Sequence, residues 1–281
     1  MKPQPRAIER VIQPEPVIEG AAVRLKRSIG TKQLNYLDPF LLFDDFTSPN
    51  PVDYTAGFPL HPHRGIETVT YILEGEVRHK DTLGNSGSIG AGDVQWMTAG
   101  RGILHEEMPQ ERPGGIAGFQ LWVNLPAKLK MTPPRYQGVL SGQIPVIRKE
   151  DGTEIRVITG CVGQTTGPVA GIAADPVYLD VSVPAGVSFV LPVKRGHSVF
   201  AYLFQGEVLF SGSGPLRALG LAVLGDGDQV EAAAGKVPAR FLLVSGKPLG
   251  EPIARYGPFV MNTREEIEQT LREIREGTFI T

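Results

Sequence analysis

An internal repeat constrains the fold of this chain more than any other feature of its sequence. Residues 64–77 (RGIETVTYILEGEV) and residues 195–208 (RGHSVFAYLFQGEV) share their Arg-Gly, Tyr and Gly-Glu-Val positions at a constant offset of 131, which is 195 minus 64. Alternation of apolar and other residues in such a segment is typical of a half-buried strand. Self-similarity at a fixed period is typical of duplicated structural units. The repeat therefore predicts two copies of one β-structured domain.

The rest of the composition indicates the fold class. Short runs of Val, Ile, Leu, Phe and Tyr lie between turns, and the 281 residues include 34 Gly and 24 Pro. Many short strands separated by turn signals are typical of an all-β sandwich or barrel. The proline-containing connection at residues 125–136 is the candidate domain boundary. We therefore expect an all-β chain of two tandem β-barrels, at 1–130 and 131–281.

The C-terminal segment has a different pattern. Thr263 followed by Glu266 forms the pattern of a capping box. Ile267, Leu271 and Ile274 then recur at helical spacing. These residues predict a helix from about residue 264 to 276 that packs across a barrel.

Charge and cysteine content narrow the classes of function and compartment. The net charge is -2 and there is no basic block, so no nucleic-acid-binding face is expected. The single cysteine, Cys161, permits no disulfide within the chain and fits a reducing compartment. The first residues lack the apolar core of a signal peptide, and no apolar run is long enough to span a membrane. We expect a monomer in the cytoplasm, without direct contact to nucleic acid or membrane.

Three of the five histidines, His61, His63 and His105, lie beside or near carboxylates. His61 and His63 face the same side of a strand because side chains alternate, and His105 and Glu107 share a face for the same reason. Imidazole suits Zn, Cu, Fe and Ni, and one added carboxylate suits Fe(II) while leaving positions open for substrate or O2. Glu67 is a rival fourth ligand, because it follows His63 by four residues. Spacing alone does not separate Glu67 from Glu107.

The second copy of the repeat lacks these residues. Pro192, Lys194, Arg240 and Leu242 occupy the corresponding positions, the first two at an offset of 131 and the others at 135 after a shift of four residues. None of the four is a usual ligand of a transition metal. We therefore expect one metal ion per chain, in the N-terminal half.

Five segments form a specific set: LDPFLLFDDF (37–46), HPHRGIETV (61–69), GDVQWMTAGRGILHEEMP (92–109), FQLWVNLP (119–126) and YGPFVMNTREEI (256–267). Together they resemble the pirin family of the cupin superfamily. The resemblance implies two tandem cupin (jelly-roll) barrels with one metal ion, usually Fe(II), in the first barrel. Its ligands would be His61, His63, His105 and Glu107, which leaves Glu67 a supporting role. Zn, Mn, Ni, Co and Cu are the alternative ions.

The resemblance also implies a function. Pirins resemble quercetin 2,3-dioxygenase, which implies that the chain opens a flavonol-like ring with O2 and that Glu107 is the catalytic base for the substrate hydroxyl. Asp44, Phe58, Gln120 and Trp122 lie on segments that could line a pocket for a small aromatic substrate.

Two other functions fit the same sequence. The first is an iron-binding, redox-responsive regulator that acts through a protein partner in transcription or metabolism. The second is a duplicated barrel with a purely structural metal. A structural site usually has closed coordination, which three histidines and one carboxylate at an open barrel mouth disfavour.

Overall fold

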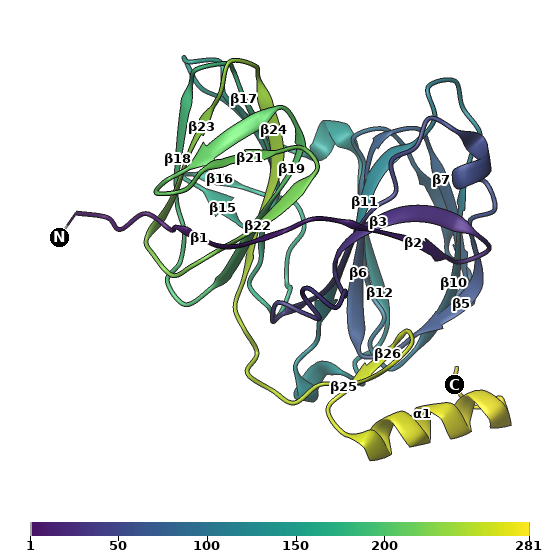
Figure 1. Cartoon of the computed structure of the whole chain (residues 1–281). Coiled ribbons are helices and arrows are strands. Elements are labelled where there is room, and N and C mark those ends of the chain that lie inside the picture. The colour runs from purple at the N-terminus through teal and green to yellow at the C-terminus, as the bar shows by residue number, and fades with distance from the viewer. Residues whose placement is uncertain (1, 281) are drawn as a thin grey trace. The chain divides into compact units, whose positions relative to one another are not determined.

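The computed structural model describes residues 2–280, which form many β-strands and a single α-helix near the C-terminus (Figure 1). The chain makes two compact units, each assembled from segments far apart in the sequence. The N-terminal barrel comprises Pro16–Gly30, Phe40–Ser141 and the chain from Leu249 on. The C-terminal barrel comprises the chain up to Glu15, Thr31–Pro39 and Gly142–Pro248. The prediction of an all-β chain with two barrels and a C-terminal helix is confirmed.

Two sheets build the N-terminal barrel, with strand orders β12–β9–β6–β11–β4–β3–β2 and β5–β10–β7–β8. Strand β6 carries the first copy of the repeat and pairs antiparallel with β9 and β11. Successive residues of β10 alternate between buried and half-buried, so one face of that strand points into the barrel. The strands are β2 (Glu15–Glu19), β3 (Val23–Ile29), β4 (Phe40–Asp45), β5 (Phe58–His63), β6 (Ile66–Glu74), β7 (Val77–Asp81), β8 (Ser86–Ile89), β9 (Val94–Thr98), β10 (Ile103–Pro109), β11 (Ala117–Asn124) and β12 (Arg135–Val139).

The C-terminal barrel repeats this topology strand for strand, with the orders β1–β22–β19–β24–β17–β14–β13 and β18–β23–β20–β21. Strand β19 carries the second copy of the repeat and takes the place of β6, as the sequence predicts. The strands are β1 (Ile8–Ile12), β13 (Val146–Arg148), β14 (Glu154–Thr159), β17 (Val177–Val183), β18 (Ser188–Pro192), β19 (Ser198–Gln205), β20 (Glu207–Phe210), β21 (Pro215–Arg217), β22 (Gly220–Leu224), β23 (Gln229–Ala234) and β24 (Ala239–Gly246). Short elements complete the chain: β15 (Cys161–Val162), β16 (Thr165–Thr166), β25 (Ala254–Tyr256), β26 (Phe259–Met261) and the 3-10 helices η1 (Pro51–Asp53), η2 (Ala127–Leu129) and η3 (Ser141–Gln143).

This topology corrects the residues expected to replace the metal ligands. Strand β23 takes the place of β10, since it lies between β18 and β20 as β10 lies between β5 and β7. Its inward residues include Val230 and Ala232, which are 0% and 4% exposed. The residues expected there, Arg240 and Leu242, lie instead on β24. A constant sequence offset fails here because the connections between the strands differ in length.

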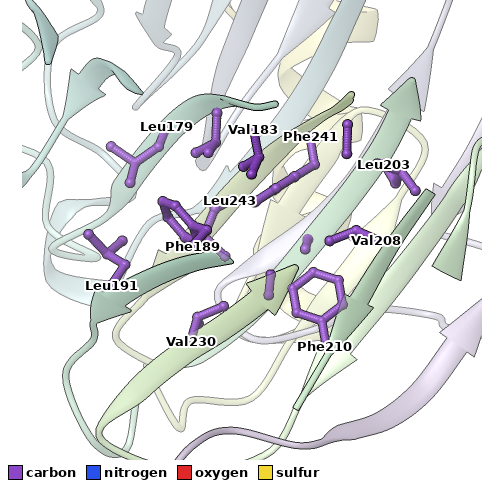
Figure 2. Packing of buried hydrophobic residues seen from close by; sticks show 14 of the residues in the cluster. Leu179, Val183, Phe189, Leu191, Leu203, Val208, Phe210, Val230, Phe241 and Leu243 are labelled. Carbon is purple, nitrogen blue, oxygen red and sulfur yellow. The ribbon is translucent and has the colours of Figure 1, made fainter. Parts of the chain in front are cut away.

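Apolar side chains fill the interior of the C-terminal barrel. Leu179, Phe189, Phe210, Val230 and Phe241 converge from different strands of both of its sheets (Figure 2). The rings of Phe189 and Phe241 meet edge to face, with centroids 5.7 Å apart. Full burial of such a side chain stabilises a fold by about 1.5–3 kcal/mol. Packed side chains therefore fill the interior of this barrel, whereas the N-terminal barrel contains a cavity, described below.

The predicted helix is present as α1, Arg264–Glu276. Thr263 Oγ1 accepts a hydrogen bond from the amide of Glu266 (3.2 Å), and the Glu266 carboxylate accepts one from the amide of Thr263 (2.8 Å). Gly277 ends the helix in the left-handed conformation that favours glycine, at φ 71°. Within residues 2–280, no helix is long and apolar enough to cross a membrane.

The compact units differ from the contiguous domains 1–130 and 131–281 in four segments, three of which contain β1, β12 and α1. Strand β1 pairs with β22 in the C-terminal barrel, although it precedes every strand of the N-terminal barrel. Strand β12 pairs with β9, and α1 packs against β26, so both belong to the N-terminal barrel. The physical reason is that edge strands take partners from anywhere along the chain, which a local boundary signal does not record.

Candidate metal centre

Strands β5 and β10 bring three predicted ligands together. His61 lies directly opposite His105 in the antiparallel register, and His63 follows on the same face of β5. One possible ligand atom from each of the three histidines lies within 4.8 Å of the others. A bulge in β5 then places Phe58 opposite Glu107. Bulges of this kind are common next to active sites, where they re-aim side chains.

Burial keeps the imidazoles of His63 and His105 neutral. His63 and His105 are 2% and 1% exposed. Burial first, and then the neighbouring histidines, lower the pKa of His63 well below its usual range and that of His105 to about 3. A neutral imidazole has a free lone pair, which is the form that binds a metal ion. The cluster is therefore prepared to bind a cation at neutral pH.

The ring nitrogens also fit a metal ion. His61 Nδ1 lies 2.9 Å from the carbonyl oxygen of Pro59. A carbonyl only accepts, so Nδ1 carries the proton and Nε2 keeps the lone pair. Among residues 2–280, neither ring nitrogen of His105 nor Nδ1 of His63 has a hydrogen-bond partner, although all three atoms are buried. A buried polar atom without a partner is costly, and a bound ion would satisfy the cluster.

The two candidate carboxylates lie on opposite faces of the barrel wall. Glu107 is 7% exposed, lines the same cavity as His61, and accepts a hydrogen bond from Thr70 Oγ1 (2.9 Å). Glu67 has the opposite parity to Thr70 on β6 and accepts a hydrogen bond from Thr98 Oγ1 (2.7 Å). Burial raises the pKa of Glu67. The geometry thus directs Glu107 to the cavity, and coordination by Glu107 stays a prediction.

The cavity beside the histidines measures about 330 Å³ and belongs entirely to the N-terminal barrel. Its walls include all four pocket residues suggested by the sequence: Asp44, Phe58, Gln120 and Trp122. The ring of Trp122 meets that of His63 at nearly a right angle, with centroids 5.1 Å apart. Pockets for drug-sized ligands begin at about 300 Å³, so a compact aromatic molecule fits.

The polar residues of this cavity that sequence reasoning missed include three that contact other groups of the site. Arg27 forms a two-pronged ion pair with Asp44, with both N–O distances 2.8 Å. Burial raises the pKa of Asp44 to about 6, while Arg27 opposes the rise. The guanidinium of Arg255 lies 5.0 Å from the Trp122 ring centroid. Thr70 is the third residue.

Only one of these residues carried a usable signal. Thr70 has the inward parity of β6, although β-branched residues are common in any strand. Arg255 follows the whole second copy of the repeat, so nothing local connects it to the first barrel.

Comparisons with known proteins find related sequences and a related structure. Residues 22–123 match the family model described as Pirin, and residues 178–280 match the Pirin C-terminal cupin domain. A pirin-like protein of Caulobacter vibrioides is 45% identical over 98% of this chain and 99% of its own length. Human pirin is 44% identical over 92% of this chain and 89% of its own. The crystal structure of quercetin 2,3-dioxygenase from Acinetobacter baumannii superposes with a TM-score of 0.88 at 35% identity, covering 98% of each chain.

Proposed function

The chain belongs to the pirin family of the cupin superfamily, and from this premise we propose that it is a metal-dependent dioxygenase that opens a flavonol-like ring with O2. The observation that carries the proposal is a cluster of three imidazoles, two of which line a largely apolar cavity of about 330 Å³. The A. baumannii protein named quercetin 2,3-dioxygenase supports the substrate class.

The histidine cluster and the residues of the cavity would have different roles in this reaction. His61, His63 and His105 would hold the ion, for which we propose Fe(II), with Glu107 as the fourth ligand. When bound, the ion supplies Lewis acidity toward a substrate oxygen and a site for O2. Glu107 would accept the proton of the substrate hydroxyl at a carboxylate oxygen.

The walls would orient the substrate and keep water out. Phe58 and Trp122 present apolar surface to a flat ring. Arg255 and the Arg27–Asp44 pair offer hydrogen-bond donors and acceptors to hydroxyl groups that project from the ring. Together they favour a polyhydroxylated aromatic molecule over a purely apolar one.

The test is O2 consumption and carbon monoxide release with quercetin, using protein loaded anaerobically with Fe(II). We expect turnover that metal-free protein and Glu107→Ala lack. His61→Ala should lose the ion, as measured by elemental analysis, with its strand content kept. His197→Ala is the matched control, because His197 lies in the C-terminal barrel, 3.7 Å from Asp175. Loss of the ion in the control would contradict a site confined to the N-terminal barrel.

A regulatory role is the second candidate, and the exposure of two apolar side chains next to the cavity favours it. Leu60 is 54% exposed and adjoins Pro59 and His61, while Tyr256 is 61% exposed and adjoins Arg255. Exposed apolar surface at a site is typical of a surface that a protein partner covers. Absence of turnover from fully loaded protein, together with a partner that binds only the ferrous or only the ferric form, would favour this function.

A further inference from the structure

The hydroxyl of Thr70 lies between two acceptors beside the metal centre. Thr70 Oγ1 is 2.9 Å from Glu107 Oε1 and 2.7 Å from the side-chain oxygen of Gln120. Thr70 is 3% exposed and Glu107 is 7% exposed. The contact between Thr70 and Glu107 is therefore shielded from water, and shielding makes a hydrogen bond electrostatically stronger, whereas Gln120 is half-buried.

A hydroxyl has one proton, so Thr70 cannot donate to both neighbours. An ionised carboxylate only accepts, and a metal ligand is ionised. Thr70 must then donate to Glu107 and accept from Gln120. Gln120 meets this need by a half-turn of its carboxamide, which exchanges its oxygen for an N–H donor. The result is a directed series, from the Gln120 N–H to the Thr70 hydroxyl to Glu107.

The backbone holds this series in place. Thr70 and Gln120 are direct cross-strand partners on β6 and β11. Glu107 comes from β10, in the other sheet of the same barrel. The branched side chain of threonine has a restricted χ1, so its hydroxyl is held in a fixed direction. The hydrogen bond thus links the two sheets through the candidate ligand.

From this geometry we infer that Thr70 is a positioning residue for Glu107, oriented in turn by Gln120. Thr70 engages one carboxylate oxygen, Oε1, and leaves Oε2 available to a metal ion. The inference rests on the proposed function in one respect, which is that Glu107 is a metal ligand. Outer partners of metal ligands typically contribute about 10- to 100-fold to metal affinity.

The same barrel contains a matched control. Thr98 donates to the buried carboxylate of Glu67 at 2.7 Å, so this pair has the same chemistry as Thr70 and Glu107. Glu67 lies on the face of β6 turned away from the cavity. A purely structural effect of losing a buried Thr–Glu hydrogen bond should appear equally at both places, whereas a positioning effect should appear only at Thr70.

The experiment is titration of metal-free protein with Co(II), followed by the visible absorption of the bound ion and by a competing chelator. We expect Thr70→Val to weaken Co(II) binding about 10- to 100-fold and to alter the spectrum. Thr70→Ser, which restores the hydroxyl, should restore both the affinity and the spectrum. Thr98→Val should bind Co(II) as the unaltered protein does. Gln120→Met, which removes the donor to Thr70, should weaken binding by a smaller factor and serves if Thr70→Val does not fold.

The outcomes separate the inference from its premise. Unchanged Co(II) binding by Thr70→Val or Gln120→Met, with weakened binding by Glu107→Ala, would overturn the role of Thr70 and leave Glu107 as a ligand. Equal losses in Thr70→Val and Thr98→Val would show a structural effect and also overturn it. Unchanged Co(II) binding by Glu107→Ala would show that Glu107 is not a ligand and would end the inference. Turnover of quercetin by protein whose metal is held by the three histidines alone could still be tested.

Discussion

At the scale of single residues, the buried histidine cluster lowers the stability of the metal-free protein. Two imidazoles are buried where protonation is strongly disfavoured, and the pKa of His105 is lowered to about 3. Evolution of a core alone would favour apolar residues at such positions, because a buried polar group without a partner destabilises a fold. The cluster is better explained by a bound ion than by packing.

This cost predicts the acid sensitivity of the metal-free protein. In the unfolded chain His105 takes up a proton near its ordinary pKa of 6.5, whereas in the folded chain it does so only near pH 3. The unfolded state therefore binds more protons between these values, and the free energy of unfolding falls as pH falls from about 6.5 toward 3. Each pKa unit corresponds to about 1.4 kcal/mol.

Urea unfolding of metal-free protein at a series of pH values measures this slope. His105→Leu, which removes the titrating group and keeps a similar volume, should flatten it. His197→Leu should change the slope less, because its lowered pKa reflects weaker burial and a nearby carboxylate, Asp175, that opposes the shift. Identical slopes for His105→Leu and the unaltered protein would contradict the prediction.

The residue scale also shows how much of the site the sequence could predict. His61, His63 and His105 were found because alternation along a strand is a local property with a period of two. Thr70 and Gln120 required the cross-strand register, and Arg255 required the return of the chain after the second barrel. The ligand cluster is therefore readable from spacing, whereas the surroundings that tune it depend on pairings between distant segments.

At the scale of elements, helix α1 follows from a local sequence pattern, whereas the pairing of the edge strands depends on distant segments. The bounds of α1 were predictable because its start is fixed by the Thr263–Glu266 capping box and its end lies beside Gly277. The partners of β1 and β12 were not predictable, because the edge of a sheet accepts any strand with a suitable pattern. A boundary near residue 130 rests on local sequence alone, whereas these segments join their compact units through pairing with distant strands.

The capping box gives the element-scale prediction. Thr263→Ala removes the oxygen that accepts from the Glu266 amide, and we expect it to lower the free energy of unfolding by about 1 kcal/mol. Thr263→Ser should stay close to the unaltered protein, because serine supplies an equivalent oxygen. Chemical denaturation followed by circular dichroism measures both. A loss in Thr263→Ser as large as that in Thr263→Ala would show that the cap is not the cause.

At the scale of the whole molecule, the two barrels share one strand order but have different interiors. In the N-terminal barrel the strands β5 and β10 direct imidazoles toward a cavity, and in the C-terminal barrel β18 and β23 direct Phe189, Leu191, Val230 and Ala232 into a packed core. The cluster of histidines lies in one barrel, and the other barrel has His197 alone. The other barrel carries a continuous apolar interior (Figure 2).

A deletion at the N-terminus can test whether the C-terminal barrel depends on residues that precede the N-terminal barrel in the sequence. Strand β1 covers the edge of β22, and Arg6 is 1% exposed and donates to the carbonyl oxygens of His197 (3.0 Å), Gly225 (2.6 Å) and Lys194 (2.8 Å). Removal of residues 2–12 would uncover that edge and leave these acceptors without their donor. Leaving a buried acceptor unsatisfied costs about 1–3 kcal/mol.

We therefore expect deletion of residues 2–12 to lower hydrogen-exchange protection in β22 and β19 of the C-terminal barrel, while β5 and β10 keep theirs and Co(II) binding is unchanged. Arg6→Met should produce a smaller loss in the same strands, because it removes the guanidinium and keeps the strand. Val11→Ala is the control, since Val11 is 45% exposed and its backbone pairing with Ala222 does not depend on its side chain. Equal loss of protection in β10 would mean that the two barrels unfold as one unit, because within residues 2–280 the strand pairing of β1 is with β22.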